Sequence, residues 1–275
     1  MHELHLQVGQ AMKKAVVVFS GGQDSTTCLY AARADGYAVH AITFDYGQRH
    51  RREIEAARII AEMADVTHEV IELGKGVLQG TSPLVSENEL EQYDNPQALP
   101  GGLEKTFVPM RNQLFLTIAA NRAYVIGTNV VYTGVCQEDY GGYPDCRRLF
   151  IDAVERASSL GTFTGEPDTM DELQIVTPLM FMSKEDAVNY ALTLDGCYEA
   201  LAYSHTSYAG EYPPSSKDHA SLLRAKGFAA AGVPDPLILR AYLEGAIPTL
   251  PDSPNYKNGA LGYYLDAIAT VVGKY

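Results

Sequence analysis

Basic residues are scarce in this chain of 275 residues. It has 21 lysines and arginines against 34 aspartates and glutamates, which gives a formal net charge of −13. A protein that neutralises many phosphates along a nucleic acid needs a basic surface, so this balance argues against direct binding of DNA or RNA. An anionic substrate therefore has to be held by a local site.

Long apolar runs are also absent. Runs such as Ala15 to Phe19 cover only a few residues, far fewer than the ~20 that a membrane-crossing helix needs. The N-terminal stretch MHELHLQVGQAMKK contains neither the apolar core nor the small-residue cleavage site of a secretory signal. We therefore expect no membrane span and a cytoplasmic location.

Cysteine is rare and irregularly spaced. Cys28, Cys136, Cys146 and Cys197 show no CxxC spacing, which is typical of reduced thiols rather than of a disulfide framework. The chain is 46% hydrophobic and 20% charged, the composition of an ordinary globular protein. A wholly disordered chain is excluded, and one large domain, or one domain with an appendage, is indicated.

Strand-like and helical segments alternate through most of the chain. We predict strands at 15–19, 38–44, 67–73, 129–134 and 173–177, and helices at 25–35, 51–64, 112–127, 146–160 and 184–194. Such alternation favours an α/β fold in which helices wrap a parallel sheet. Residues 74–105 carry Gly, Pro, Ser and acidic residues without clear periodicity, which predicts a long functional or mobile loop.

The pattern changes after residue 194. Residues 195–216 are rich in Tyr, Ser, Gly and Pro, and helical patterns follow at 217–231, 236–244 and 263–272. We therefore predict two parts, an α/β domain at 13–194 and a small, mostly helical C-terminal region at 195–275, with an extension after 233.

The strongest chemical signal is the string SGGQDS at residues 20–25, between an apolar strand and a helix. Its two glycines let the backbone turn sharply and approach an anion, and the N–H groups and dipole of the helix start favour negative charge. With the hydroxyls of Ser25, Thr26 and Thr27, the string predicts a pyrophosphate pocket. The spacing is neither that of the kinase-type P-loop nor that of a dinucleotide loop. A plain turn, whose Ser and Asp cap the helix, stays open as the alternative.

Longer strings carry a resemblance to known families. FSGGQDS resembles the signature of the PP-loop ATP pyrophosphatase superfamily, whose members cleave ATP between the α and β phosphates and transfer AMP to a carbonyl or carboxylate oxygen. FDYGQRH at 44–50, FVPMRN at 107–112 and GGYPDCR at 141–147 each follow a predicted strand or open a helix, at the edge that faces the ligand crevice of an α/β sheet. Together with TGVCQEDYGGYPDCR, they closely resemble the 7-cyano-7-deazaguanine synthase (QueC) family from about Lys14 to Phe228.

The resemblance implies an ATP-dependent ligase of queuosine biosynthesis, with a Rossmann-like PP-loop domain, ATP and Mg²⁺ as cofactors and a homodimeric assembly. Its substrates are 7-carboxy-7-deazaguanine and ammonia. AMP transfer turns a carboxylate oxygen into a leaving group that ammonia displaces, and a second adenylation removes the amide oxygen in the same pocket. Two alternatives stay open: an enzyme that stops at 7-amido-7-deazaguanine or passes the activated acid to another amine, and a catalytically silent nucleotide sensor.

The same resemblance implies the residues that bind ATP and perform adenylation. Asp24 is suited to a shared Mg²⁺ ion, and the planar fork of Arg111 to a carboxylate or the α-phosphate. Ser25 and Lys184 complete the expected catalytic set, in which Lys184 neutralises the leaving pyrophosphate. A helix-start carboxylate for Asp24 and a surface ion pair for Arg111 stay open. The expected ATP contacts are Phe19, Ser20, Gly21, Gly22, Gln23, Asp24, Ser25, Thr26, Phe44 and Gly134.

The deazaguanine contacts are expected from the second group of strings. Asp139 and Asp145 can accept hydrogen bonds from the guanine N1–H and exocyclic amine, and Tyr143 can stack on the ring. Arg147 offers a further positive charge near the pyrophosphate. A turn role for Asp145 stays open. The full expected set is Arg111, Asn112, Asp139, Tyr143, Asp145 and Arg147.

The chain departs from the family pattern at a zinc site and at one glycine. Ser207, Ser215, Asp218 and Ser221 stand where the family has four zinc-binding cysteines, and hydroxyls are poor zinc ligands, so we expect no zinc. A substitute site is disfavoured because Asp218 and His219 diverge by about 100° on a helix. We expect a hydrogen-bonded Ser/Asp cluster, tyrosine packing and the C-terminal extension in its place. Met110 replaces a Gly, which is a strained choice if positive φ is needed there.

Overall fold

A parallel β-sheet lies at the centre of the protein. The computed structural model describes residues 12–86, 88–94, 103–137, 142–163, 172–214 and 217–275. Within these residues, five strands are arranged in the order β3-β2-β1-β4-β5 and every pairing is parallel. The strands are β1 (Lys14–Val18), β2 (Ala38–Asp45), β3 (Thr67–Glu72), β4 (Val130–Thr133) and β5 (Gln174–Val176). The predicted α/β class with a parallel sheet is confirmed.

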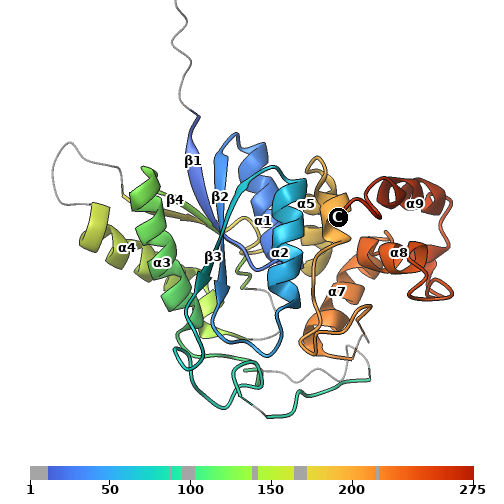
Figure 1. Ribbon diagram of the computed structural model, residues 1–275, viewed down its shortest axis with the longest axis horizontal. Coiled ribbons are helices and arrows are strands. Elements are labelled where there is room, and N and C mark those ends of the chain that lie inside the picture. Colours follow the sequence, from blue (N-terminus) through green and yellow to red (C-terminus); the bar gives the residue numbers. More distant parts are fainter. Residues whose placement is uncertain (1–11, 87, 95–102, 138–141, 164–171, 215–216) are drawn as a thin grey trace, which may run out of the picture.

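Helices cover both faces of this sheet (Figure 1). On one face lie α1 (Gln23–Ala34) and α2 (Arg52–Met63), with α5 (Lys184–Leu192) beside α1. On the other face lie α3 (Arg111–Ile126) and α4 (Arg148–Ser158). Side chains of β1 alternate between the two resulting cores: Ala15 and Val17 pack in one and Val16 in the other. A strand buried on both faces has this pattern.

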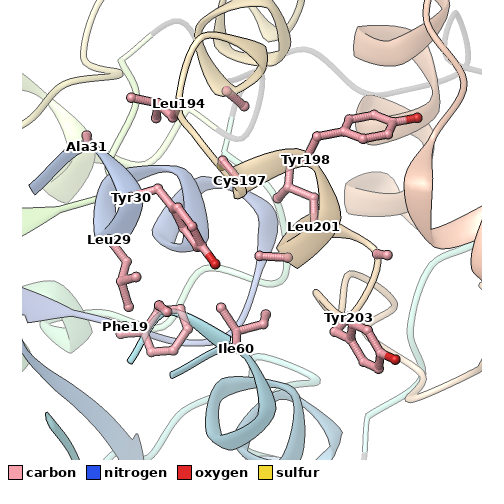
Figure 2. Packing of buried hydrophobic residues seen from close by; sticks show 14 of the residues in the cluster. Phe19, Leu29, Tyr30, Ala31, Ile60, Leu194, Cys197, Tyr198, Leu201 and Tyr203 are labelled. Carbon is pink, nitrogen blue, oxygen red and sulfur yellow. The ribbon is translucent and has the colours of Figure 1, made fainter. Parts of the chain in front are cut away.

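The C-terminal helices continue the core on the α1 side. They are α6 (Cys197–Leu201), α7 (His219–Ala230), α8 (Pro236–Leu243) and α9 (Leu261–Ala269). Helix α6 contacts α1, and Figure 2 shows Leu29 and Tyr30 among the side chains of Cys197, Tyr198 and Leu201. Residues from both sides of position 194 therefore share one hydrophobic core, and the division of the chain at that position stays a prediction.

Most predicted elements match the structure to within a few residues, with α6 as the main omission. This five-residue helix follows Gly196, which has a φ of 75°, in a stretch whose composition suggested irregular chain. The string SKED at 183–186 predicts a capping box at the start of α5. The structure confirms it, because Asp186 N–H donates to Ser183 Oγ at 3.1 Å. Short turns of other helix types are η2 (Pro144–Cys146), η3 (Ser159–Phe163) and η4 (Pro254–Tyr256).

Two further expectations concern loops. The described part of 74–105 forms no helix or strand, yet Leu78 and Leu84 are buried in the core, so these parts pack against the domain. Met110 has a φ of 65° and a side chain that is 62% exposed, which confirms the predicted strain. Over the residues that the structure describes, none of the helices combines the length and apolarity that crossing a membrane requires.

Candidate active site

The site lies where the sheet changes direction. Strands β2 and β3 follow one another on one side of β1, whereas β4 and β5 lie on the other. In a parallel α/β sheet, the carboxyl ends of the two strands at such a switch point open into a crevice that holds ligands. Residues Ser20 to Gly22 follow β1 and Gly134 follows β4, and a cavity of about 320 Å³ lies between these segments.

The turn after β1 is shaped by contacts that only glycine permits. Gly21 has a φ of 84°, and a Cβ added there would lie 2.4 Å from the carbonyl oxygen of Glu53 in α2. A Cβ on Gly134 would lie 2.9 Å from the backbone nitrogen of Ser25. The loop between β1 and α1 is therefore held tightly by α2 on one side and by the chain after β4 on the other.

Hydroxyl groups inside the turn hold its shape. Ser25 Oγ lies 3.1 Å from Ser20 Oγ and accepts a hydrogen bond from Ser20 N–H at 3.2 Å. Thr26 Oγ1 donates to the carbonyl oxygen of Gly22 at 2.8 Å. Gly22 is the N-cap of α1, and among the described residues no side chain caps this helix. Ser20 Oγ accepts a hydrogen bond from Gly22 N–H at 3.2 Å. The start of α1 lines the cavity, and the choice between a phosphate pocket and a plain turn stays a prediction.

A lysine from a distant helix reaches this turn. Lys184 Nζ, at the start of α5, donates to Asp24 Oδ2 at 2.8 Å. The two side chains are 17% and 25% exposed, and both residues line the cavity. A cation thus lies directly beside the predicted pyrophosphate pocket.

Arg111, at the start of α3, also lines the cavity and lies near three phenol groups. Burial lowers its pKa, but Tyr46, Tyr143 and Tyr208 raise it, and the net pKa of Arg111 is above its usual value. Burial is also the main reason why the pKa of Tyr46 is raised. Arg111 therefore stays charged and presents its guanidinium to the cavity.

Glu53 is a cavity residue that the sequence analysis missed. It lies in the first turn of α2, and burial raises the pKa of its carboxyl to about 7, against an opposing effect of Arg111. A signal was present, because Glu53 stands three residues after the FDYGQRH string that was assigned to this edge of the sheet.

Aromatic side chains also line the cavity. Phe44 stacks on Phe115, with ring centroids 4.2 Å apart and planes within 7°. Tyr143 OH lies 2.6 Å from Thr106 Oγ1, which ties the 103–107 segment to the cavity. The cavity lining thus combines charged and aromatic side chains.

Most of the expected ATP and substrate residues come together here. Those that line the cavity are Phe19, Ser20, Gly22, Gln23, Asp24, Ser25, Phe44, Arg111, Asn112, Gly134, Tyr143 and Lys184. Gly21 and Thr26 do not line it but shape the turn behind it. Asp139 lies outside the described residues.

Asp145 and Arg147 are placed differently from the expectation. Asp145 is buried in η2, does not line the cavity, and accepts a hydrogen bond from Asn112 N–H at 3.4 Å. Burial raises the pKa of its carboxyl. Arg147 is exposed at the N-cap of α4 and does not line the cavity either. In this structure, Asp145 supports Asn112, and Arg147 lies outside the cavity lining.

The described positions at which the resemblance implied zinc ligands make local hydrogen bonds instead. Asp218 is the N-cap of α7 and accepts hydrogen bonds from Ser221 N–H and Ser221 Oγ, both at 2.9 Å. Ser207 Oγ accepts from Ala209 N–H at 3.2 Å, and Ser215 lies outside the described residues. The predicted Ser/Asp cluster is confirmed for Asp218 and Ser221, and these donors do not fit zinc.

The fold and the cavity define a class: a parallel α/β protein with a glycine turn that opens into a cavity at its switch point. The sequence model of the family described as "Queuosine biosynthesis protein QueC" matches residues 14–232. The chain belongs to this family. It is 49% identical over 229 residues to a 7-cyano-7-deazaguanine synthase of Gloeobacter violaceus, covering 82% of this chain and 96% of that protein. It is 48% identical to the protein of the same name from Laribacter hongkongensis, covering 82% and 94%.

Solved structures match at lower similarity. A 4-thiouridine synthetase in complex with RNA and bound ATP is 18% identical, with a TM-score of 0.42, over 94% of this chain and 54% of that chain. A predicted tRNA methyltransferase subunit from Methanocaldococcus jannaschii is 20% identical, with a TM-score of 0.40, over 62% and 68%.

Proposed function

We propose that this chain is a 7-cyano-7-deazaguanine synthase that acts in queuosine biosynthesis. On this proposal it is an ATP-dependent ligase that joins ammonia to 7-carboxy-7-deazaguanine and converts the resulting amide to the nitrile. Relatives of that name support the proposal, at 48–49% identity over most of the chain. The observation that carries it is a single cavity lined by the Asp24–Lys184 pair and by Arg111.

The proposed ATP end is the glycine turn. Backbone N–H groups at the start of α1 hold the pyrophosphate, and the close packing of Gly21 and Gly134 keeps them aimed at it. Lys184 compensates the charge that develops on the leaving pyrophosphate. The Asp24 carboxylate and the Ser20 and Ser25 hydroxyls are hard oxygen donors and fit Mg²⁺, which would supply charge compensation on the phosphates.

The proposed acid end is Arg111 with its ring of tyrosines. The guanidinium orients the substrate carboxylate so that one oxygen attacks the α-phosphorus, which forms the acyl–AMP bond and releases pyrophosphate. Ammonia then forms a bond to the carbonyl carbon, and AMP leaves with the electron pair of the broken C–O bond. Adenylation of the amide oxygen and loss of AMP and two protons give the nitrile. Asn112 and Tyr143 are the proposed contacts to the purine-like ring.

The test is turnover of purified protein with ATP, ammonium chloride and 7-carboxy-7-deazaguanine. We expect pyrophosphate release that depends on the acid, and a product with the mass of the nitrile. Accumulation of the amide, or of an adduct with another amine, would favour the first alternative. Binding of ATP without any pyrophosphate release would favour the nucleotide sensor.

A further inference from the structure

Two buried side chains next to the cavity have acceptor atoms without a partner. Glu104 and His219 have side chains that are 2% and 6% exposed, and Glu104 Oε1 lies 3.6 Å from His219 Nε2. Among the described residues, neither of these two atoms has a hydrogen-bond partner. A buried polar group without a partner costs about 1–3 kcal/mol. A missing ligand that donates hydrogen bonds would remove this cost.

The space beside these atoms has the size of one small molecule. A cavity of about 10 Å³ is lined by both Glu104 and His219, and roughly 10–15 Å³ is the least that admits a molecule of the size of water. His219 and Tyr208 line this small cavity and also the large one. A molecule held by Glu104 and His219 therefore lies beside the proposed acid end of the active site.

The chemistry of the two atoms limits what can bind. A carboxylate oxygen only accepts hydrogen bonds, and an imidazole Nε2 also accepts in the tautomer that carries its proton on Nδ1. Burial raises the pKa of the Glu104 carboxyl and Glu91 adds to the rise, while His219, Tyr93 and Lys105 lower it. Lys105, which also lines this cavity, is paired with Glu91. The fitting ligand is thus small, donates at least two hydrogen bonds and balances the charge of the Glu104 carboxylate. Ammonium meets all three requirements.

We propose that Glu104 and His219 form a binding subsite for the ammonium ion that supplies the nitrogen of the product. This inference rests on the proposed function. Two hydrogen bonds of Thr106 hold the segment that carries Glu104. Ser82 Oγ donates to the Thr106 carbonyl oxygen at 3.0 Å, and Thr106 Oγ1 lies 2.6 Å from Tyr143 OH. The bound ammonium ion gives one proton to the Glu104 carboxylate and leaves as ammonia, whose lone pair attacks the activated acid. The subsite thereby raises the local concentration of the nitrogen donor beside that acid.

The experiment compares two nucleophiles in the full chain. Glu104→Gln keeps the shape of the side chain but removes its negative charge. We expect the KM for ammonium to rise about tenfold or more, which corresponds to ~1.4 kcal/mol, and the KM for ATP to change less than about twofold. Turnover driven by hydroxylamine, which is uncharged at neutral pH, is expected to stay at the wild-type rate. Glu89→Gln, an exposed position on the same loop that lines neither cavity, is the control and is expected to change nothing.

A binding measurement separates the subsite from the chemistry. Ammonium chloride is expected to raise the unfolding temperature of the wild-type protein and not that of Glu104→Gln, whereas potassium chloride at the same ionic strength gives no such difference. Equal stabilisation by potassium, or an unchanged ammonium KM in Glu104→Gln, would show that Glu104 and His219 are only an ion pair. The wild-type protein could bind ammonium and yet release no pyrophosphate with either nucleophile. That result would contradict the proposed synthase activity but would support the ammonium subsite.

Discussion

Lys184 and Asp24 are 160 positions apart in the sequence, yet Lys184 Nζ donates a hydrogen bond to Asp24 Oδ2 at 2.8 Å. This pair joins the start of α5 to the first turn of α1. Both residues line the cavity together with the glycine turn. A phosphate group bound in this cavity would lie near the ammonium group of Lys184. A Mg²⁺ ion bound to that phosphate would lie near the carboxylate of Asp24.

The first prediction concerns Lys184→Met. We expect the rate of pyrophosphate release to fall about 100-fold or more, since a charge that stabilises the transition state is typically worth ~3 kcal/mol. Because the pair is partly exposed, the unfolding free energy should change by less than about 1 kcal/mol. Release is measured with a coupled pyrophosphate assay. Lys257→Met, which removes an exposed lysine paired with Asp252, is the control and should leave turnover unaltered; a similar loss in both variants would contradict the assignment.

The second prediction separates backbone strain from steric clash in the glycine turn. Gly21 and Gly36 have almost the same φ, 84° and 83°, but an added Cβ clashes with α2 at Gly21 and meets nothing within 4 Å at Gly36. Gly36→Ala should cost only the strain of a left-handed residue, about 1 kcal/mol. Gly21→Ala should cost at least ~1 kcal/mol more, because the α2 backbone has to move, and should abolish ATP binding.

Denaturant titration and ATP-induced stabilisation measure the two effects. An equal loss of unfolding free energy in Gly21→Ala and Gly36→Ala would mean that the α2 backbone moves away from the added Cβ at little energetic cost. Retention of wild-type ATP affinity in Gly21→Ala would mean that the turn does not hold the nucleotide.

The sequence predicted the glycine turn at residues 20–25 because this turn depends only on residues that are neighbours in the chain. Adjacent glycines between an apolar strand and a helix are read directly from neighbouring residues, and the same is true of the capping box at Ser183. Glu53 was missed for the opposite reason. Its raised pKa comes from burial and from a position near Arg111, contacts that depend on how α2 and α3 pack on the sheet.

The positions of two expected substrate residues also could not be predicted from the sequence. Asp145 and Arg147 lie in a string that resembles a binding motif, but the η2 turn directs Asp145 towards Asn112 and leaves Arg147 exposed at the start of α4. Sequence spacing gave the correct edge of the sheet. It did not give the direction of each side chain, because that depends on the turn geometry.

The third prediction concerns the pH dependence of stability at Glu53. Its carboxyl has a pKa of about 7 in the folded protein, above the reference value of 4.5, so the folded state holds this proton more tightly than the unfolded state does. The resulting stability is full below pH 4.5 and is lost as the pH rises through 7. Glu53→Gln removes this dependence and should stabilise the protein above pH 7 by up to about 3 kcal/mol.

Denaturant titrations at pH 5 and pH 8 measure this effect. The difference in unfolding free energy between the two pH values should shrink in Glu53→Gln and stay at the wild-type value in Glu55→Gln, an exposed neighbour on the same helix. Parallel pH profiles of the wild-type protein and Glu53→Gln would disprove the shift.

The fourth prediction concerns the buried Arg224, which joins the C-terminal extension to the cavity. Its guanidinium donates two hydrogen bonds to Asp235, at 2.7 and 2.8 Å, and others to Ser204 Oγ, Thr206 Oγ1 and the Leu201 carbonyl oxygen. The neighbouring His205 N–H donates to the Gly21 carbonyl oxygen at 2.9 Å. Arg224 therefore fixes the segment that supports the phosphate turn.

Breaking this pair leaves a buried charge without its partner. Asp235→Asn should destabilise the protein by about 3–5 kcal/mol and weaken ATP binding. In a double-mutant cycle, Arg224→Met combined with Asp235→Asn should cost less than the sum of the two single changes. Additive costs would show that the pair acts as two separate groups.

The last prediction concerns Met110, which holds a left-handed backbone conformation directly before Arg111. A side chain with a Cβ costs about 1–2 kcal/mol in this conformation, and glycine removes that cost but loses up to ~1 kcal/mol of entropy on folding. Because the Met110 side chain is 62% exposed, little packing is lost. Met110→Gly should therefore raise the unfolding free energy by roughly 0.5–1 kcal/mol. Asp65→Gly is the matched control, because Asp65 also has a left-handed backbone, with a φ of 50°. Aspartate tolerates this region better than methionine does, so Asp65→Gly should raise the unfolding free energy by less than Met110→Gly. A loss of stability in Met110→Gly, measured by denaturant titration, would mean that the methionine side chain makes a contact worth more than the strain it imposes.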